Sequence, residues 1–211
     1  MKKNLTINFF LISLVGLSQV NSVVYTRDYE FSEGLYLTIN QFKNNTPINN
    51  TSIVANISKN SVDFLKQVVQ EKYIVYRDTM GIEQKIQTTE IWGYTQNRML
   101  YIYYNNDFSR VNVIGTLLQF TALVTTTASF MDPMYSNYGL STTTEELRLF
   151  IYDTQTEKTI PFDLKSFTTL IKRDTELYDQ FMKLGKREKY DSQFIYLRKY
   201  NEKHPLMLPL K

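Results

Sequence analysis

Runs of apolar, β-branched and aromatic residues recur over residues 70–115, and short polar clusters separate them. This pattern predicts β-strands over 72–77, 82–94, 99–104 and 108–114. Asn, Asp and Gly residues lie between the segments and favour tight turns. Strands joined by tight turns pair with their neighbours, so the region predicts an antiparallel β-meander.

The stretch 111–131 contains no charged residue. Thr, Asn and Gln dilute it and β-branched residues are abundant, which disfavours a membrane helix and favours β-structure. We therefore predict two buried strands that meet near Gly115. Residues 132–145 are expected to form a loop, and 147–152 alternates as a half-buried strand.

After the last of these strands the apolar period lengthens to that of a helix. Asp163 and Asp174 each precede an amphipathic segment at the N-cap position, and a third helical segment covers about 187–203. The predicted fold class is α+β, an antiparallel β-meander sheet followed by two or three C-terminal helices packed on it. We assign 23–162 to the β-rich region and 163–211 to the helical region of the same domain.

Residues 1–22 have the organisation of a secretory signal peptide. Lys2 and Lys3 form a basic start, 5–20 is mostly apolar, and small or aliphatic side chains precede a cleavage point after Ser22. A retained membrane anchor is the alternative, but the apolar stretch is short for a span and contains polar residues. We expect cleavage, a periplasmic or extracellular location, and a mature protein that is not integral to a membrane.

The composition excludes several kinds of chemistry. The 211 residues include no Cys and one His. This excludes disulfides, thiolate metal sites, a thiol nucleophile, a lipid anchor on Cys, and a metal site built from several His of one chain. We predict no cofactor and no metal site.

The charge changes once the signal peptide is set aside. The full chain has a net charge of +3, and removing Lys2 and Lys3 leaves +1. That charge divides into −3 over 23–162 and +4 over 163–211. A nearly neutral protein offers no electrostatic basis for nucleic-acid binding, so none is expected.

Several short segments together are characteristic. They are Glu33-Gly34-Leu35-Tyr36-Leu37-Thr38, Phe42-Lys43-Asn44-Asn45-Thr46-Pro47, Ile91-Trp92-Gly93-Tyr94, Phe108-Ser109-Arg110 with Ile114-Gly115, and Lys199-Tyr200-Asn201-Glu202. In these segments the chain resembles an uncharacterised family of secreted proteins from Bacteroidetes-type bacteria. The resemblance implies a Gram-negative envelope or extracellular location. It implies no activity and carries over no catalytic residue.

Standard hydrolytic sites find little support in the sequence. His204 lies in a basic segment near the end of the chain, and there is no Gly-x-Ser-x-Gly motif. A glycosidase needs only two carboxylates, so a carboxylate-dependent glycan hydrolase is the alternative function. Asp132 is the most distinctive acid because it lies in an aromatic loop before Pro133. No catalytic residue is assigned, and we favour a protein that is not an enzyme.

Four aromatic residues of one predicted hairpin are the candidate binding residues. Pairing across Gln96-Asn97 would place Tyr94 opposite Met99 and would gather the four rings on one face of the hairpin. Rings that are apolar with a polar tip stack on sugars or pack on proteins. The alternative is that phenylalanines of the C-terminal helices cover this face. The candidate residues are Trp92, Tyr94, Tyr101 and Tyr103.

These observations favour an exported bacterial protein with a binding or structural role in the envelope or the medium. Its partner would be a glycan or an envelope protein. The composition contributes mainly by excluding functions. The charge argues against nucleic-acid binding, and the single His and the absence of Cys argue against most metal sites and hydrolytic sites.

Overall fold

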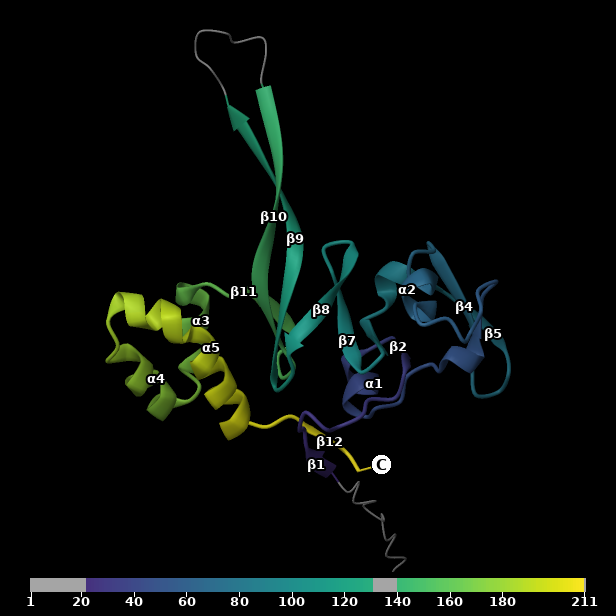
Figure 1. The fold of residues 1–211 in the computed structure, drawn as a ribbon, viewed down its shortest axis with the longest axis horizontal. Helices are drawn as coiled ribbons and strands as arrows, with labels where there is room; N and C mark the ends of the chain where they lie inside the picture. Colours follow the sequence, from purple (N-terminus) through teal and green to yellow (C-terminus); the bar gives the residue numbers. More distant parts are fainter. Residues whose placement is uncertain (1–21, 131–139, 211) are drawn as a thin grey trace, which may run out of the picture.

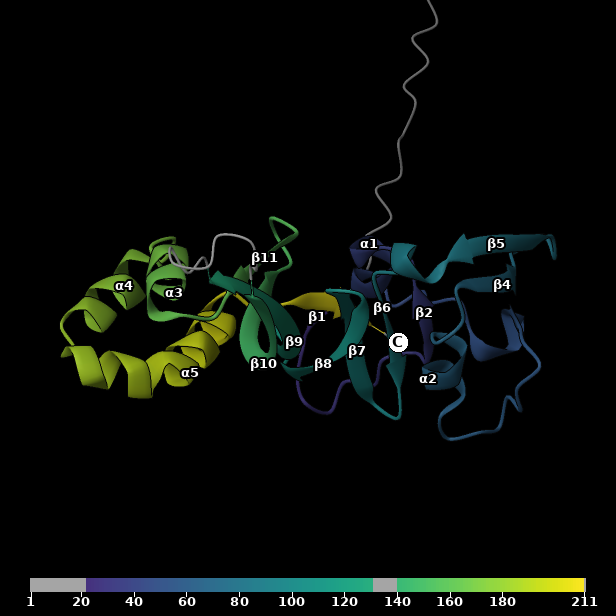
Figure 2. The ribbon, with the colours of Figure 1, turned by 90° about the horizontal axis from the view of Figure 1, so that it is seen from above.

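The computed structural model describes residues 22–130 and 140–210, which form three bodies in a row (Figures 1 and 2). A seven-stranded antiparallel sheet lies in the middle, with a small three-stranded sheet on one side and a group of three helices on the other. The predicted α+β class, with its antiparallel sheet and C-terminal helices, is confirmed.

The central sheet is a meander in which six strands follow one another along the chain, and β2 completes it beside β6. Asn97 and Arg98, and likewise Asn105 and Asn106, have positive φ, the conformation that two-residue type I′ hairpin turns require. The meander predicted for this part of the chain is confirmed. Its strands are β2 (Gly34–Tyr36), β6 (Gly93–Gln96), β7 (Met99–Tyr104), β8 (Asp107–Val113), β9 (Leu117–Phe130), β10 (Leu140–Asp153) and β11 (Lys158–Pro161).

One face of this sheet is covered by segments from near both ends of the described chain. The helix α1 (Ile39–Lys43) begins at Thr38, whose hydroxyl accepts a hydrogen bond of 3.2 Å from within the helix. The strand β1 (Ser22–Val24) pairs antiparallel with β12 (Met207–Pro209). Phe42 of α1 is fully buried against the sheet, in the same core as apolar residues of β12.

The three-stranded sheet departs from the predicted single meander. β4 (Tyr73–Arg77) and β5 (Glu83–Gln87) form a hairpin, but they pair with β3 (Ile53–Val54) in a sheet of their own. The expectation is wrong here because a 3₁₀ turn at Thr88–Glu90 separates β5 from the central strands. The helix α2 (Phe64–Val68) shares one apolar core with this sheet and with the central sheet.

The C-terminal helices are α3 (Leu164–Ile171), α4 (Thr175–Met182) and α5 (Lys186–Lys203). The predicted aspartates cap the first two: Asp163 accepts a hydrogen bond of 2.7 Å from a backbone N–H of α3, and Asp174 accepts one of 3.0 Å in α4. Carboxylates at these positions satisfy free N–H groups and favour the positive end of the helix dipole. The sequence therefore predicted both helix starts correctly.

The helix α5 packs against the connection between β8 and β9, at the predicted break near Gly115. Asn201 accepts a hydrogen bond of 2.8 Å from the backbone N–H of Leu117 and donates one of 2.9 Å to its carbonyl. A Cβ on Gly115 would lie 2.3 Å from the Asn201 amide carbon, so this close approach requires glycine. Leu117 and Ile151 of the central sheet join the apolar core of the helices.

Beyond the sheet, β9 and β10 continue as a two-stranded ribbon that projects from the body (Figure 1). The pairing of β8 with β9 reaches Phe120, and that of β11 with β10 reaches Phe150. Ten more β9–β10 pairs follow outward. Residues 140–145 are strand, so the expected loop over 132–145 is wrong for that part. Its earlier residues, Asp132 among them, lie outside the described residues.

Residues 1–21 of the predicted signal peptide also lie outside the described residues, and Ser22 belongs to β1. Within 22–130 and 140–210, no helix has both the length and the apolar character needed to cross a membrane.

Candidate binding cleft

The hairpin of β6 and β7 has a different register from the predicted one. Tyr94 lies opposite Tyr101 rather than Met99, because the two-residue turn is Asn97-Arg98 and not Gln96-Asn97. The shift is two residues along the ladder, so it preserves the side to which each strand residue points.

Tyr94, Tyr101 and Tyr103 lie along one contiguous aromatic group. The rings of Tyr94 and Tyr101 stack with centroids 4.6 Å apart, and Phe108 contacts Tyr94 and Tyr103 edge-on at 5.3 and 5.2 Å. Tyr94 is buried, and desolvation raises the pKa of its phenol. The body formed by α2 and the three-stranded sheet covers Tyr94, Tyr101 and Phe108. The alternative expectation, that the C-terminal helices cover this face, is wrong for these residues.

Trp92 lies apart from this group, in the core on the other side of the sheet. Its ring is 4.9 Å from that of Phe42 and 5.7 Å from that of Tyr152. The predicted gathering of all four rings is wrong for Trp92, because β6 begins at Gly93 and the strand alternation does not extend back to residue 92. Ile91 instead occupies the core beneath the three-stranded sheet.

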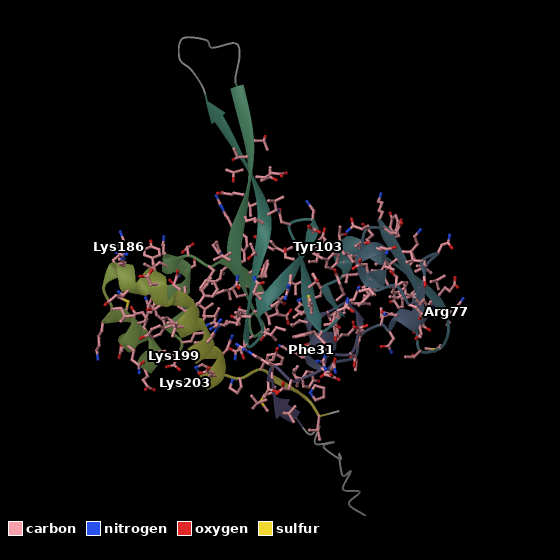
Figure 3. The ribbon with its side chains drawn as sticks, in the orientation of Figure 1. Phe31, Arg77, Tyr103, Lys186, Lys199 and Lys203 are labelled. Atoms are coloured by element: carbon pink, nitrogen blue, oxygen red, sulfur yellow. The ribbon has the colours of Figure 1, made fainter. Side chains whose placement is uncertain are left out.

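Trp92 and Tyr103 nevertheless meet at a cleft of about 310 Å³. The backbone N–H of Tyr103 donates a hydrogen bond of 2.9 Å to the carbonyl of Trp92, which ties the two residues together at the end of the ladder. Figure 3 labels Tyr103 on the β7–β8 hairpin. The cleft is lined by Leu37, Thr89, Glu90, Ile91, Trp92, Ile102, Tyr103, Tyr152 and Thr159.

The polar groups of this cleft are hydroxyls and one carboxylate. Glu90 is exposed, and its carboxylate accepts a hydrogen bond of 3.1 Å from the backbone N–H of Gln87. Burial raises the pKa of the Tyr152 phenol, and a side-chain hydrogen bond with Trp92 opposes that rise. The cleft therefore offers neutral aromatic rings beside one negative acceptor.

Sequence reasoning missed Tyr152 and Glu90 as members of this site. Tyr152 comes from β10, and only the three-dimensional curl of the sheet brings it to Trp92. The one available signal was its position two residues after Phe150 in an alternating strand, which predicts a shared face. Glu90 could have been found from its place directly before the Ile91-Trp92 pair.

A second, larger cleft of about 590 Å³ lies between β8, α5 and the segment after β1. Arg27, Arg198 and Glu202 provide its charges, and Asn112 and Asn201 add amides. None of the sequence-predicted residues lines it. Each of the two clefts contains one carboxylate, Glu90 in the first and Glu202 in the second.

His204 takes part in a polar cluster at the end of α5. Its Nε2 lies 2.8 Å from a carboxylate oxygen of Asp174, and Lys203 lies 2.9 Å from the other. The backbone carbonyl of His204 accepts a hydrogen bond of 2.6 Å from the Thr116 hydroxyl. These contacts join the start of α4 to the end of α5. In the part of the chain that the structure describes, no group of three or more His, Asp or Glu residues could hold a metal ion.

Comparisons with known proteins add no further information on this site. No family model matches the chain, no curated protein matches it in sequence, and no solved structure matches its fold.

Proposed function

We propose that this is an exported bacterial protein that binds a glycan in the cleft of Trp92, Tyr103 and Tyr152. The observation that carries the proposal is one cleft lined by the ring pair of Trp92 and Tyr152, with centroids 5.7 Å apart, and also by Tyr103 and the exposed residue Glu90. Sugars present apolar C–H faces that pack on aromatic rings, while their hydroxyls donate hydrogen bonds to carboxylates and phenols. Aromatic rings and hydrogen-bond acceptors are both present among the residues that line this one cleft.

The size of the cleft limits the ligand. At about 310 Å³ it lies at the lower end of ligand pockets, which run from roughly 300 to 1,000 Å³. One or two sugar rings are the natural occupants. A chain end or a side branch of a glycan fits this description better than the middle of a long polymer.

The single carboxylate favours binding over cleavage. Glycosidases use two carboxyl groups that flank the scissile bond about 5–10 Å apart. The cleft supplies Glu90 and no second acid. The hydrolase alternative therefore gains no support from this site, and we propose a binding or structural role in the envelope or the medium.

Export rests on the pattern of residues 1–22 and on the resemblance to secreted proteins. Fractionation of producing cells, followed by N-terminal sequencing, tests it. We expect the protein in the periplasm or medium with Val23 as its first residue. Recovery of the uncleaved chain from the cytoplasm would contradict export without bearing on the cleft.

The one Trp of the chain provides a direct probe of the cleft. We expect glycan binding to change Trp92 fluorescence, after a glycan array has identified the class of sugar. Tyr103→Ala and Glu90→Gln should each weaken binding by about tenfold, the loss of roughly 1.4 kcal/mol of contact. Tyr190→Ala is the matched control, because Tyr190 is 53% exposed on α5 and outside the cleft. Equal binding by all variants would overturn the proposal.

A further inference from the structure

The outer part of the β9–β10 ribbon exposes a row of leucines to solvent. Leu123 and Leu147 are directly paired across the two strands, and they are 46% and 73% exposed. Leu149 lies two residues further along β10, on the same side, and is 38% exposed. Ile151, next in this row, is fully buried under the C-terminal helices. The apolar row therefore begins in the core and continues outward into water.

The ribbon extends well beyond the strands that support it. The pairing of β8 and β11 ends at Phe120 and Phe150, and ten β9–β10 pairs follow. Ten pairs correspond to a length of about 33 Å. A two-stranded ribbon alone is marginally stable in water, and its free edges invite pairing or docking. Ala122 and Val124 still pack on the central core, and the Asn105 amide donates a hydrogen bond of 2.8 Å to the Leu123 carbonyl, so the six pairs beyond Val124 project furthest. The exposed leucines and this projecting length point to a partner surface.

The same side of the ribbon carries one acid just beyond the leucines. Glu145 precedes Leu147 by two residues and is exposed, so it shares the leucine side. Glu146 points to the opposite side, where it pairs with Arg148. The exposed leucines with Glu145 beside them suit a cationic apolar partner.

The exposed side of α5 has the complementary character. Tyr190, Phe194 and Ile195 are 53%, 38% and 52% exposed at helical spacing. Basic residues flank them, with Lys186 and Arg187 at the start of the helix and Arg198 and Lys199 near its end, while Glu188 and Asp191 are the acids between. Figure 3 labels Lys186 and Lys199. The region 163–211 carries a charge of +4. The length of the helix, 18 residues or about 27 Å, is close to that of the ribbon.

We infer that the leucine side of the ribbon docks on the exposed side of α5 in a second copy of the chain. The outer ribbon projects away from the body that contains its own α5 (Figure 1). A different surface on each copy makes this a head-to-tail contact, which leaves a free ribbon at one end and a free helix at the other. Such contacts form rings or open filaments rather than closed two-fold dimers. A self-assembling exported protein results.

The mass of the purified full chain, measured by light scattering and sedimentation over a range of concentrations, tests the inference. Wild type should form species that grow with concentration. Leu147→Asp should weaken association by at least about tenfold, the effect of a central interface residue. A monodisperse monomer throughout, or association unchanged by Leu147→Asp, would overturn it.

Charge reversal distinguishes this contact from any other apolar association. Glu145→Lys and Arg187→Glu should each weaken assembly, and the double variant should restore it in part. Glu146→Lys is the matched control, with the same charge change on the opposite side of the ribbon, and should assemble like wild type. If the wild type stays monomeric but sediments with anionic phospholipid vesicles through Phe194 and Ile195, α5 binds membranes and the second-copy inference is wrong.

Discussion

The two bodies that flank the central sheet are attached to it by different chemistry. On one side, α2 and the three-stranded sheet share an apolar core with the central sheet, and a neutral amide adds the polar link. Gln96 accepts a hydrogen bond of 3.1 Å from the backbone N–H of Lys66 and donates to the carbonyl of Val62. On the other side, the amide of Asn201 and the hydroxyl of Thr116 also link α5 to the central sheet. Two buried carboxylates, Asp153 and Asp174, which are 2% and 6% exposed, add polar links that carry charge.

Asp153 and Asp174 join the helices to each other and to the sheet. Arg173, just before α4, contacts Asp153 of β10 at 2.6 Å. Asp174 caps α4 and binds Lys203 at the end of α5. The strength of a hydrogen bond from a neutral amide does not change with pH, whereas the strength of a carboxylate link depends on the ionisation of the carboxylate. The helical body should therefore be the acid-sensitive part of the molecule.

Truncation of the two apolar cores should have the largest effect and should not distinguish the bodies. Phe64 in the first core and Phe181 in the second are almost completely buried. Phe64→Ala and Phe181→Ala should each lower the free energy of unfolding by about 3–5 kcal/mol. Urea denaturation measures both. A loss confined to one variant would show that the other body does not unfold with the central sheet.

Removal of the polar links should lower the free energy of unfolding by different amounts in the two bodies. Asp174→Ala removes a helix cap, leaves His204 without its acceptor and leaves Lys203 with Glu176 alone, so we expect a loss of about 2 kcal/mol. Gln96→Ala should cost about 1 kcal/mol, the usual value for a neutral hydrogen bond. The same denaturation experiment compares them. Equal losses would mean that the charge of Asp174 adds nothing to its role as a cap.

Acid should destabilise the helical body before it destabilises the body formed by α2 and the three-stranded sheet. A hydrogen bond from the Leu177 N–H, with Lys203 and His204 alongside, lowers the pKa of Asp174. Burial raises the pKa of Asp153, but hydrogen bonds from Thr156 and Arg173 outweigh it and the net pKa is lowered. Because both folded-state pKa values are depressed, the stabilisation is complete above the unfolded pKa of about 3.9. It is lost as pH falls through the folded values.

Amide hydrogen exchange between pH 5 and pH 2 checks this order. We expect protection in α3, α4 and α5 to fall before protection in α2 and β4. The variant Asp153→Asn with Asp174→Asn should lose stability at neutral pH and show a flatter acid dependence, while Asn still caps α4. An unchanged acid profile in the double variant would place the sensitivity elsewhere.

The parts of the fold that the sequence predicts correctly are those with local causes. Asp163 and Asp174 mark helix starts because capping involves residues three apart, and the hairpins follow from Asn-rich turns. The separate three-stranded sheet was not predictable, because nothing local distinguishes β5 from a strand of the meander. The pairing of β5 with β4 in a separate sheet depends on the 3₁₀ turn at Thr88–Glu90 and on contacts with α2.

The candidate site was predictable in part for the same reason. Trp92 and Tyr103 were identified from one hairpin, and both line the cleft. Tyr94 and Tyr101 share that hairpin but belong to the core under α2. Strand alternation predicts which residues share a side of the sheet, but it does not predict which side distant segments cover. It also fails for Trp92, because the strand begins at Gly93. Tyr152 joins the cleft through the curl of the sheet, which no local pattern encodes.

The smallest effect is expected for the exposed ion pair on the β4–β5 hairpin of the three-stranded sheet. Arg77 and Glu83 lie opposite each other on β4 and β5, 3.0 Å apart, with side chains 57% and 54% exposed (Figure 3). Such pairs contribute about 0–1 kcal/mol, because water screens the attraction and two flexible side chains lose freedom.

A double-mutant cycle with Arg77→Ala and Glu83→Ala should therefore give a coupling energy of about 0.5 kcal/mol or less. In 1 M salt, where the screening length is about 3 Å, it should vanish. The same cycle on Arg173 and Asp153 should give about 1–2 kcal/mol, since Asp153 is 3% exposed in its side chain and salt reaches it poorly. A coupling at Arg77–Glu83 as large as that at Arg173–Asp153 would contradict the expected difference between an exposed ion pair and one with a buried carboxylate.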